Sequence, residues 1–442
     1  MFIIMADIFS NVNKICNLTY GHMFVTILPR FLTGTQLYKI DNPKNNYNNV
    51  THAFFLALAI TIAEPSTVLP LIVAHFSDSV IMVGIFVSLL RGGAIVIQLY
   101  AAFHAQAYKR VLPYVAKVFF FRWFSWLLIG LSIYFIGDSN KPLTLFFIGL
   151  GLFFFSFTAG FGTIYFKELQ AKLFSKKYRG KTMANRNVAG SIASIISGAI
   201  TGYVLTNFEA PQNYAYLFMV SSFLMAIGFV AFISIDEPAK ENVSLKEKNF
   251  KLFVKNSLKL LKQDKRLQAQ ILVIFLSFSY FLAMPFVILN AKNIFPLTGW
   301  ILGGFITVQM LGSILGSSLL WRKIHNYEKM LSLSFIFMIL AFLVALFAHN
   351  VYTYALIFLL FGIGLDGLNI SGMNLVIEIA PEDKRPIYTA LQTNITSIGL
   401  FFPILGGVLL KYFQSYSLIY SLSIALLGVG LFLSFKLKEE QA

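Results

Sequence analysis

The chain has 442 residues, of which 57% are hydrophobic and 12% are charged, and its mean hydropathy is +0.73. This composition leaves no room for a soluble domain of useful size. The formal net charge is +16 at pH 7, but a nucleic-acid-binding protein would carry that charge on a soluble basic face, so we expect no nucleic-acid partner. The single cysteine, Cys16, excludes an intramolecular disulfide and a thiolate metal cluster.

Twelve long apolar runs follow one another along the sequence. Each run has about 19 to 25 residues, which as a helix is long enough to cross roughly 30 Å of hydrocarbon. In chain order, the runs lie at residues 53–74, 81–103, 114–136, 143–165, 187–206, 214–235, 268–290, 299–320, 330–348, 352–376, 388–410 and 416–435. We therefore predict an all-α integral membrane protein with twelve transmembrane helices.

The basic residues are concentrated in alternate gaps between these runs. Lys141, Lys292 and Lys411 lie in odd-numbered loops, and Arg91 and Arg122 lie inside runs. Apart from Lys117, in the first turn of the third run, every other Lys or Arg falls in the N-terminal tail, an even-numbered loop or the C-terminus. Because cationic loops resist translocation, we expect both termini and all even-numbered loops to be cytoplasmic. The expected location is a lipid bilayer crossed many times, in a bacterial cytoplasmic (inner) membrane.

The two halves of the sequence repeat each other weakly. A shift of 220 residues places Pro65 on Pro285, and a shift of 206 residues places Arg179 on Arg385. Matches in the right order at similar shifts indicate a duplicated six-helix unit. The predicted divisions are a cytoplasmic N-terminal tail (1–51), a six-helix bundle (52–235), a cytoplasmic amphipathic linker (236–267), a second six-helix bundle (268–437) and a cytoplasmic C-terminus (438–442).

These features together resemble the major facilitator superfamily. The resemblance rests on twelve helices in two sixes, on the basic central loop, and on the segments Tyr178-Arg179-Gly180-Lys181 and Ala380-Pro381-Glu382-Asp383-Lys384-Arg385. It covers roughly residues 52–438. The chain departs from the family's Gly-x-x-x-Asp-Arg-x-Gly-Arg-Arg loop after the second helix, where residues 101–110 keep only the basic end. The resemblance implies two pseudo-symmetric six-helix bundles and transport by alternating access around a site at mid-depth.

Four ionisable residues, Glu64, Arg91, Arg122 and Asp366, stand out well inside the apolar runs, where a charged group is costly unless it is paired or hydrated. Glu64 lies about eleven residues, or roughly 17 Å, into the first helix. Arg91 lies at a similar depth in the second, so Glu64 can pair with Arg91 or with Arg122. Such a pair either holds helices together or handles substrate and protons, and both interpretations stay open. Asp366 has no basic neighbour in sequence, and the resemblance implies that it faces the substrate path.

The candidate residues fall into four groups. On the substrate or proton path we expect Glu64, Arg91, Asp366, Asn369, Gln309 and Tyr280. In structural or charge-pair roles we expect Arg122 and Gln98, and at a cytoplasmic gate Lys109, Arg110, Arg179 and Arg385. Pro65 and Pro285 remove a backbone donor, which predicts kinks in the first and seventh helices.

The function expected from these patterns is secondary active transport of a small solute that is amphiphilic or weakly charged, with a proton as the favoured coupling ion. Another ion, or uniport, stays open. No Gly-x-x-x-x-Gly-Lys-Ser loop occurs, so the chain does not use ATP directly. We expect no catalytic residues, no cofactor, no metal and no enzyme activity, and we expect a monomer. Two other interpretations also stay open: a non-transporting sensor or scaffold on the same fold, and a lipid-handling flippase.

Overall fold

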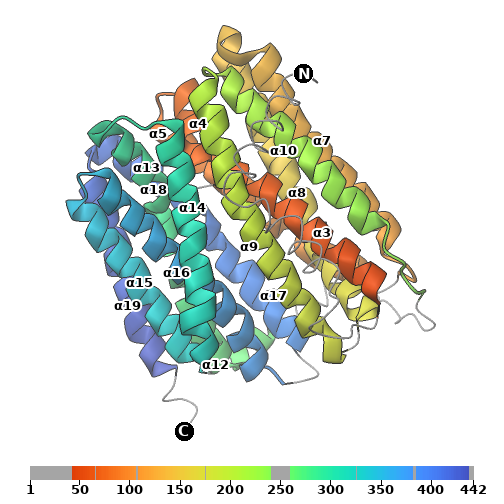
Figure 1. Ribbon diagram of the computed structural model, residues 1–442. Helices are drawn as coiled ribbons and strands as arrows, with labels where there is room; N and C mark the ends of the chain where they lie inside the picture. The colour runs from red at the N-terminus through yellow and green to blue at the C-terminus, as the bar shows by residue number, and fades with distance from the viewer. Residues whose placement is uncertain are drawn as a thin grey trace.

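The computed structural model describes residues 42–64, 66–105, 108–174, 176–239, 259–324, 326–381 and 385–437. Every regular element within these ranges is helical, and the helices run side by side through one bundle (Figure 1). Most of the predicted tail, most of the amphipathic linker and the last five residues lie outside the described part of the chain.

The first half of the chain contributes six crossings of the bundle. They are formed, in order, by α3 (Pro43–Ile60) with η1 (Thr61–Ala63) and α4 (Val68–Phe76), α5 (Val80–Gly92) with α6 (Ile95–Ala105), α7 (Leu112–Phe135), η2 (Gly137–Asn140) with α8 (Lys141–Leu173), α9 (Lys176–Asn207), and α10 (Gln212–Ile233). The first crossing bends by 41° between its two parts.

The second half contributes six more. They are formed by α12 (Lys265–Ser277) with η3 (Phe278–Leu282) and α13 (Met284–Ile294), α14 (Gly299–Leu315) with η4 (Gly316–Leu320) and η5 (Trp321–Lys323), α15 (Tyr327–Phe347), α16 (Val351–Ile379), α17 (Arg385–Thr396) with η6 (Ser397–Phe401) and α18 (Phe402–Phe413), and α19 (Tyr416–Lys436). The seventh crossing is interrupted at Ala283, two residues before Pro285, which lies in the first turn of α13.

The predicted twelve-helix architecture is confirmed. Within the described ranges, ten helices are long and apolar enough to cross a membrane, and the bent first pair makes an eleventh. The remaining crossing is α5, of 13 residues, followed by α6, of 11 residues. The first helix differs from its prediction because it begins at Pro43, ten residues before the apolar run. Asn42 caps this start by accepting the N–H of Asn45 at 3.1 Å.

Other helices begin in the same way, at a polar side chain that satisfies an N–H group of the first turn. Asn140 accepts from Leu143 at the start of α8. Asn350 forms a reciprocal capping box with Thr353 at the start of α16. These caps fix where each crossing starts, and they lie at the ends of the bundle where the chain leaves the apolar layer.

The interior of the first half is packed around aromatic side chains. Trp126 on α7 is fully buried; its ring lies 4.2 Å from that of Phe155, and its Nε1–H donates to Ser221 at 2.6 Å. By contrast, Phe120 and Phe135 on the same helix are exposed. An apolar outer surface of this kind suits contact with lipid chains.

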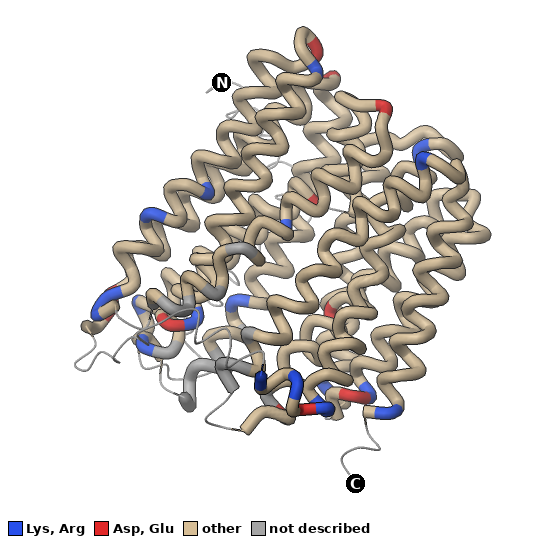
Figure 2. The backbone as a smooth tube through the Cα atoms, turned by 180° about the vertical axis from the view of Figure 1, so that it is seen from behind, with Lys and Arg blue, Asp and Glu red and all other residues tan. Residues whose placement is uncertain are grey.

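The two ends of the bundle differ in charge. Figure 2 shows Lys and Arg gathered at the end where the C-terminus lies, which we call the basic face. Helix α19 ends there at Lys436, and α8 ends there with Lys172 in its last turn. The other end, which we call the opposite face, contains the connection between α7 and α8 with Asp138 and Lys141.

The halves of the chain meet closely through helix pairs α9–α14 and α5–α18. A Cβ atom added to Gly84 on α5 would lie 2.1 Å from the carbonyl oxygen of Pro403 on α18. On the other pair, a Cβ atom on Gly303 of α14 would lie 2.3 Å from the carbonyl oxygen of Gly198 on α9. Only glycine permits such backbone approach. Both contacts lie in the part of the bundle nearer the opposite face.

Candidate functional site

The first crossing breaks at Glu64. The Glu64 N–H donates to the carbonyl oxygen of Thr61 at 3.2 Å, and the Glu64 carbonyl accepts from Thr67 and Leu69 at 3.2 and 3.3 Å. These turn contacts replace helical hydrogen bonds between η1 and α4. The helix is therefore interrupted at Glu64, inside the bundle. Pro65, the expected kink residue, lies outside the described residues, whereas the bend itself is described on both sides of it.

Ser66 joins this break to the second half of the chain. Its hydroxyl lies 3.0 Å from Oε1 of Gln309 on α14 and 3.3 Å from Oε1 of Glu64. A hydroxyl has one proton to donate, so Ser66 can serve one of these acceptors at a time. Ser66 and Gln309 are both buried. A change of partner at Ser66 would therefore alter the hydrogen bonding of an acid in the first half and an amide in the second.

Arg91 on α5 and Tyr280 in η3 complete the group. Arg91 lies within electrostatic range of both the Glu64 carboxylate and the Tyr280 hydroxyl. Its guanidinium carbon is 5.1 Å from the ring centroid of Phe281, a distance that permits cation–π attraction. No N···O contact of 4.0 Å or less joins Glu64 and Arg91, both of which are described. We call Glu64, Ser66, Arg91, Tyr280 and Gln309 the central cluster.

Asp366 and Asn369 lie on α16, away from these contacts. The carboxylate of Asp366 accepts a hydrogen bond from the hydroxyl of Ser317 in η4, so it is tied to the eighth crossing. Asn369, one turn further along α16, is exposed. Gln98 is partly buried on α6. The structure thus brings four of the six predicted path residues together and places Asp366 and Asn369 at a second position.

Arg122 on α7 faces a cavity of about 560 Å³. Its guanidinium carbon is 4.3 Å from the ring centroid of Phe155, and its Nε is buried without a hydrogen-bond partner among the described residues. The cavity also receives Lys167 from α8 and Arg186 from α9. We call this space the basic cavity, because the described residues that line it include these three cations and His52 but no Asp or Glu.

A hydrogen-bonded network holds Arg186 in place. Arg186 donates to the side-chain oxygen of Asn49 at 2.6 Å, and Asn49 and Gln170 exchange bonds of 2.9 and 3.2 Å. The two terminal nitrogens of Arg186, Nη1 and Nη2, also lie 3.3 Å from Nδ1 of His52. Since an arginine can only donate, Nδ1 is the acceptor and the His52 proton sits on Nε2. That Nε2 atom is buried without a partner in the described structure.

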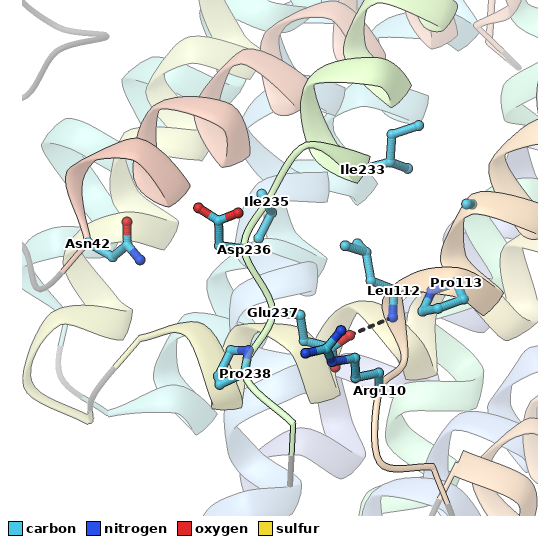
Figure 3. Close-up of a pocket in the computed structure, with 10 residues that line it drawn as sticks. Asn42, Arg110, Leu112, Pro113, Ile233, Ile235, Asp236, Glu237 and Pro238 are labelled. Atoms are coloured by element: carbon cyan, nitrogen blue, oxygen red, sulfur yellow. Dashed lines mark hydrogen bonds between the residues drawn. The ribbon is translucent and has the colours of Figure 1, made fainter.

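The expected gate residues lie at the basic face. Lys109 and Arg110 are exposed just before α7, and the Lys109 carbonyl accepts from Lys172 at 2.9 Å. Arg110 lines a groove of about 870 Å³ beside Glu237 (Figure 3). Arg179 and Arg385 belong to α9 and α17, but their side chains lie outside what the structure describes.

Glu237 ties three crossings together at this groove. Its carboxylate accepts the N–H groups of Val111 and Leu112 at 2.8 to 2.9 Å, and Figure 3 shows the contact with Leu112. The carboxylate also pairs with Lys172 at 2.6 Å. The negative charge sits at the start of α7, where the helix dipole favours it. The residue thereby connects the end of α10 to the start of α7 and the end of α8.

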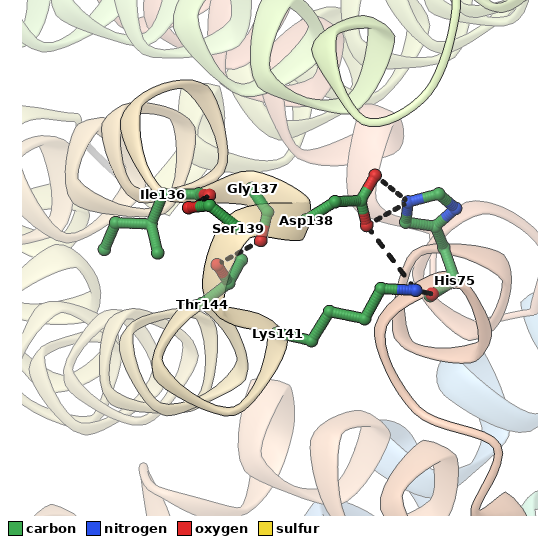
Figure 4. Close-up of polar contacts among 7 residues, drawn as sticks. All are labelled: His75, Ile136, Gly137, Asp138, Ser139, Lys141 and Thr144. Carbon is green, nitrogen blue, oxygen red and sulfur yellow. Dashed lines mark hydrogen bonds and ion pairs between the residues drawn. The ribbon is translucent and has the colours of Figure 1, made fainter.

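A smaller group of polar side chains lies at the opposite face of the first half. His75, at the end of α4, lies 3.0 Å from the carboxylate of Asp138, and Lys141 approaches that carboxylate to 3.6 Å (Figure 4). Gly137, beside Asp138, has a φ of +47°, which glycine adopts without strain. These contacts join the first crossing to the connection between the third and fourth.

Sequence reasoning missed Ser66, His52, Lys167 and Arg186. Ser66 is one of many serines in the sequence. Its position directly after Glu64 and Pro65 is the only sequence feature that distinguishes it. Lys167 and Arg186 fall in the gap between the apolar runs 143–165 and 187–206, so the sequence places both in a loop. The structure continues α8 to Leu173 and starts α9 at Lys176, so both residues are helical and reach the basic cavity.

Comparison with known proteins agrees with this architecture. A sequence model described as Major Facilitator Superfamily matches residues 50–295 and 271–442. No curated protein sequence matches. Among solved structures, the nucleoside transporter NupG has a TM-score of 0.67 at 13% identity and covers 89% of this chain and 99% of its own.

Two further structures are similar over comparable lengths. A POT family transporter in complex with a thioalcohol-conjugated peptide has a TM-score of 0.70 at 12% identity, covering 92% of this chain and 98% of its own. The human organic anion transporter MFSD10 has a TM-score of 0.61 at 12% identity, covering 90% and 100%. At such identities the likeness concerns the fold.

Proposed function

Because the chain belongs to the major facilitator superfamily and is a membrane transporter, we propose that it moves a small amphiphilic solute by secondary active transport. The observation that carries the proposal is the central cluster. Its groups come from the first, second, seventh and eighth crossings, so an acid, a base, an amide and two hydroxyls meet between the two halves of the chain. A site shared by both halves is what alternating access requires.

The packing of the halves supports an alternating mechanism. The glycine contacts of α9–α14 and α5–α18 lie nearer the opposite face, whereas the basic cavity lies nearer the basic face. We take this conformation as open toward the basic face, which is cytoplasmic in our proposal because of its positive charge. Opening the other way would part the glycine contacts and bring the bundles, residues 52–235 and 268–437, together at Lys109, Arg110, Arg179 and Arg385.

Coupling to a proton follows from the position of Glu64 in this proposal. An ionised Glu64 interacts with Arg91, and a protonated Glu64 leaves Arg91 free for a polar group of the solute. When Glu64 changes its protonation state, the Ser66 hydroxyl can move its hydrogen bond between Oε1 of Glu64 and Oε1 of Gln309. Asp366, tied to Ser317, is the alternative proton carrier. Either acid links proton uptake to a rearrangement between the halves, which is the energetic requirement for coupled transport.

A flux measurement tests the function. The purified protein would be reconstituted into liposomes with an imposed pH gradient, and uptake of uridine, a dipeptide and 1-naphthoate would be measured, since the similar folds include nucleoside, peptide and organic anion transporters. We expect saturable, gradient-stimulated uptake of at least one probe. Glu64→Gln should lose the stimulation, whereas Glu209→Gln, at an exposed acid between α9 and α10, should keep it.

Two results would contradict different parts of the proposal. Absence of saturable uptake for every probe would remove the carrier function, and uptake that ignores the pH gradient in the wild type would remove proton coupling. Spin labels test the mechanism separately. In a Cys16→Ser background, the pair Lys141→Cys and Lys292→Cys reports on the opposite face, and Lys44→Cys with Lys323→Cys reports on the basic face. Their two distances should change in opposite directions during turnover.

A further inference from the structure

The basic cavity is positively charged without compensation. Arg122, Lys167 and Arg186 make no ion pair of 4.0 Å or less with any acid that the structure describes, and none of the described lining residues is an Asp or Glu. Arg122 and Arg186 are only partly exposed. A cation held away from bulk water is costly unless an opposite charge or water compensates it. The two arginines, with Lys167 beside them, therefore favour an anion in the cavity.

The two arginines lie at similar depths in the bundle. Arg122 is ten residues after the start of α7, and Arg186 is ten residues after the start of α9. At 1.5 Å per residue, each lies about 15 Å inside the end of its helix. Lys167 lies six residues before the end of α8 and is exposed, so it sits nearer the mouth. An anion entering from the basic face would meet Lys167 before Arg122.

The donors available to a ligand differ between the two arginines. Arg186 is already engaged by Asn49 and His52. The Arg122 guanidinium makes no hydrogen bond to any described residue and lies over the face of Phe155. A guanidinium presents a planar fork that suits the two oxygens of a carboxylate or phosphate. Arg122 is therefore the group with free capacity to bind the charged end of a ligand.

Most of the remaining lining of the cavity is apolar, apart from His52, Thr163 and Gln170. Its side chains include Leu56, Val115, Phe119, Phe166, Met183 and Met373. Methionine and aromatic side chains adapt to apolar ligand bodies of varied shape. Met373 belongs to α16, in the second half, while the other residues come from the first half. A ligand in the cavity would thus contact both halves, which must separate and approach during transport.

We propose that the basic cavity binds an amphiphilic organic anion, with a carboxylate or phosphate held by Arg122 and Lys167 and an apolar body against Phe119 and Phe166. This rests on the proposed transport function, whose solute it specifies as an anion that enters from water. An anionic lipid headgroup has the same charged chemistry and is the other source that the experiment must separate. The central cluster lies deeper and would receive the solute later in the cycle.

The test is equilibrium binding to the full-length protein in nanodiscs of phosphatidylcholine, which requires no transport. The probes are 1-naphthoate, 1-naphthyl phosphate and the neutral 1-naphthamide, which share one apolar body. We expect both anions to bind at least about tenfold more tightly than the amide. Arg122→Gln should weaken anion binding by about tenfold or more, and Arg122→Lys should recover part of it. Equal affinity for acid and amide would overturn the proposal.

A matched control is available on the same helix. Lys117 is an exposed cation on α7 outside the cavity lining, so Lys117→Gln should bind the anions as the wild type does. Equal loss in Lys117→Gln and Arg122→Gln would mean that general surface charge attracts the probes, which contradicts a site. If Arg122→Gln does not give a monodisperse protein, Lys167→Gln at the mouth tests the same prediction.

Further arms separate the ligand sources and the two proposals. Adding phosphatidylglycerol to the nanodiscs should leave naphthoate affinity nearly unchanged. If phosphatidylglycerol instead competes with naphthoate, and this competition disappears in Arg122→Gln, the cavity binds a lipid headgroup. That result would contradict a solute that enters from water. Anion binding without flux in liposomes would support this inference and contradict the transport proposal. Flux of uridine with no anion binding would support the transport proposal and contradict the anion-binding inference.

Discussion

Gly198 on α9 and Gly303 on α14 touch backbone to backbone, because a Cβ atom on Gly303 would lie 2.3 Å from the Gly198 carbonyl oxygen. The contact joins the first half of the chain to the second. Gly304, the next residue, has nothing within 4 Å of the position its Cβ would take. Two consecutive glycines therefore differ in whether they bring the halves together.

The first prediction follows from this difference. In Gly303→Ala the added methyl must push α14 away from α9, and overpacking of this kind costs about 1 to 3 kcal/mol. We expect lower thermal stability in detergent and a longer spin-label distance at the opposite face. Gly304→Ala should be neutral or slightly stabilising, since alanine favours helix over glycine. Equal stability of the two variants would contradict a close contact between the halves.

Glu237 supplies the second prediction. Its side chain and that of Lys172 are 1% and 8% exposed, so Glu237→Ala would leave a buried lysine without its partner and the start of α7 without an acceptor. Breaking a buried pair in this way costs about 3 to 5 kcal/mol. We expect a large loss of thermal stability, measured by the temperature at which the monodisperse protein peak is halved.

The neighbouring residue provides the control. Asp236 pairs with Lys44 at 2.8 Å, but the two side chains are 70% and 64% exposed. Because exposed pairs contribute about 0 to 1 kcal/mol, Asp236→Asn should change stability little. A similar loss in both variants would show that charge in this segment matters in general, and that the capping contact of Glu237 does not.

The sequence was sufficient to predict the helical crossings because the apolar runs report directly on transfer into lipid. It also predicted which residues to examine, since Glu64 and Arg91 are charges inside such runs. Their relation to each other needed the structure. Composition does not fix how a helix is rotated about its axis, so Arg91 and Arg122 were equal candidates as partners of Glu64. The structure places Arg91 near Glu64 and Arg122 in the basic cavity.

The basic cavity itself could not be derived from the apolar runs. Hydropathy marks where a helix becomes too polar for lipid, and not where the helix ends. His52 and Arg186 lie in helical segments that continue past the apolar runs, because Asn49 and Gln170 satisfy the polar groups there. Helical periodicity carried through the polar flanks would have placed these residues on facing helices. It would not have shown that acidic residues are missing from the lining.

The third prediction concerns the opposite face. Asp138 lies close to His75 and Lys141, and these side chains are about a quarter to a half exposed, so the contacts add little to global stability. They do order the connection between α7 and α8 (Figure 4). We expect Asp138→Asn to accelerate amide hydrogen exchange in residues 136–144 without a large change in thermal stability. Asp78→Asn, at an exposed acid in the neighbouring loop, should leave exchange there unchanged.

The fourth prediction concerns pH and the basic face of the second half. Asp264 caps α12 by accepting the Leu267 N–H at 3.0 Å, and it accepts the hydroxyl of Tyr388 on α17. Partial burial raises the pKa of this carboxyl, but the hydrogen bonds from Tyr388, Leu267 and Arg266 outweigh burial and hold the pKa below its ordinary value. The ionised form is therefore more stable in the folded protein than in the unfolded chain.

The sign of the pH dependence follows from that direction. A lowered pKa contributes stability above the ordinary carboxyl pKa of about 4, and the contribution is lost as pH falls through the folded value. At pH 7, Asp264→Asn should be less stable than the wild type by up to about 1 kcal/mol, because asparagine keeps the N-cap contact and solvent screens the lost charge. The difference should hold to about pH 5 and shrink below about pH 4. Thermal unfolding of the wild type, Asp264→Asn and Tyr388→Phe between these values measures it, and Tyr388→Phe should show a smaller loss with the same pH trend. A difference that grows on acidification would mean that the Asp264 carboxyl is stabilised in its protonated form, which contradicts the capping contact.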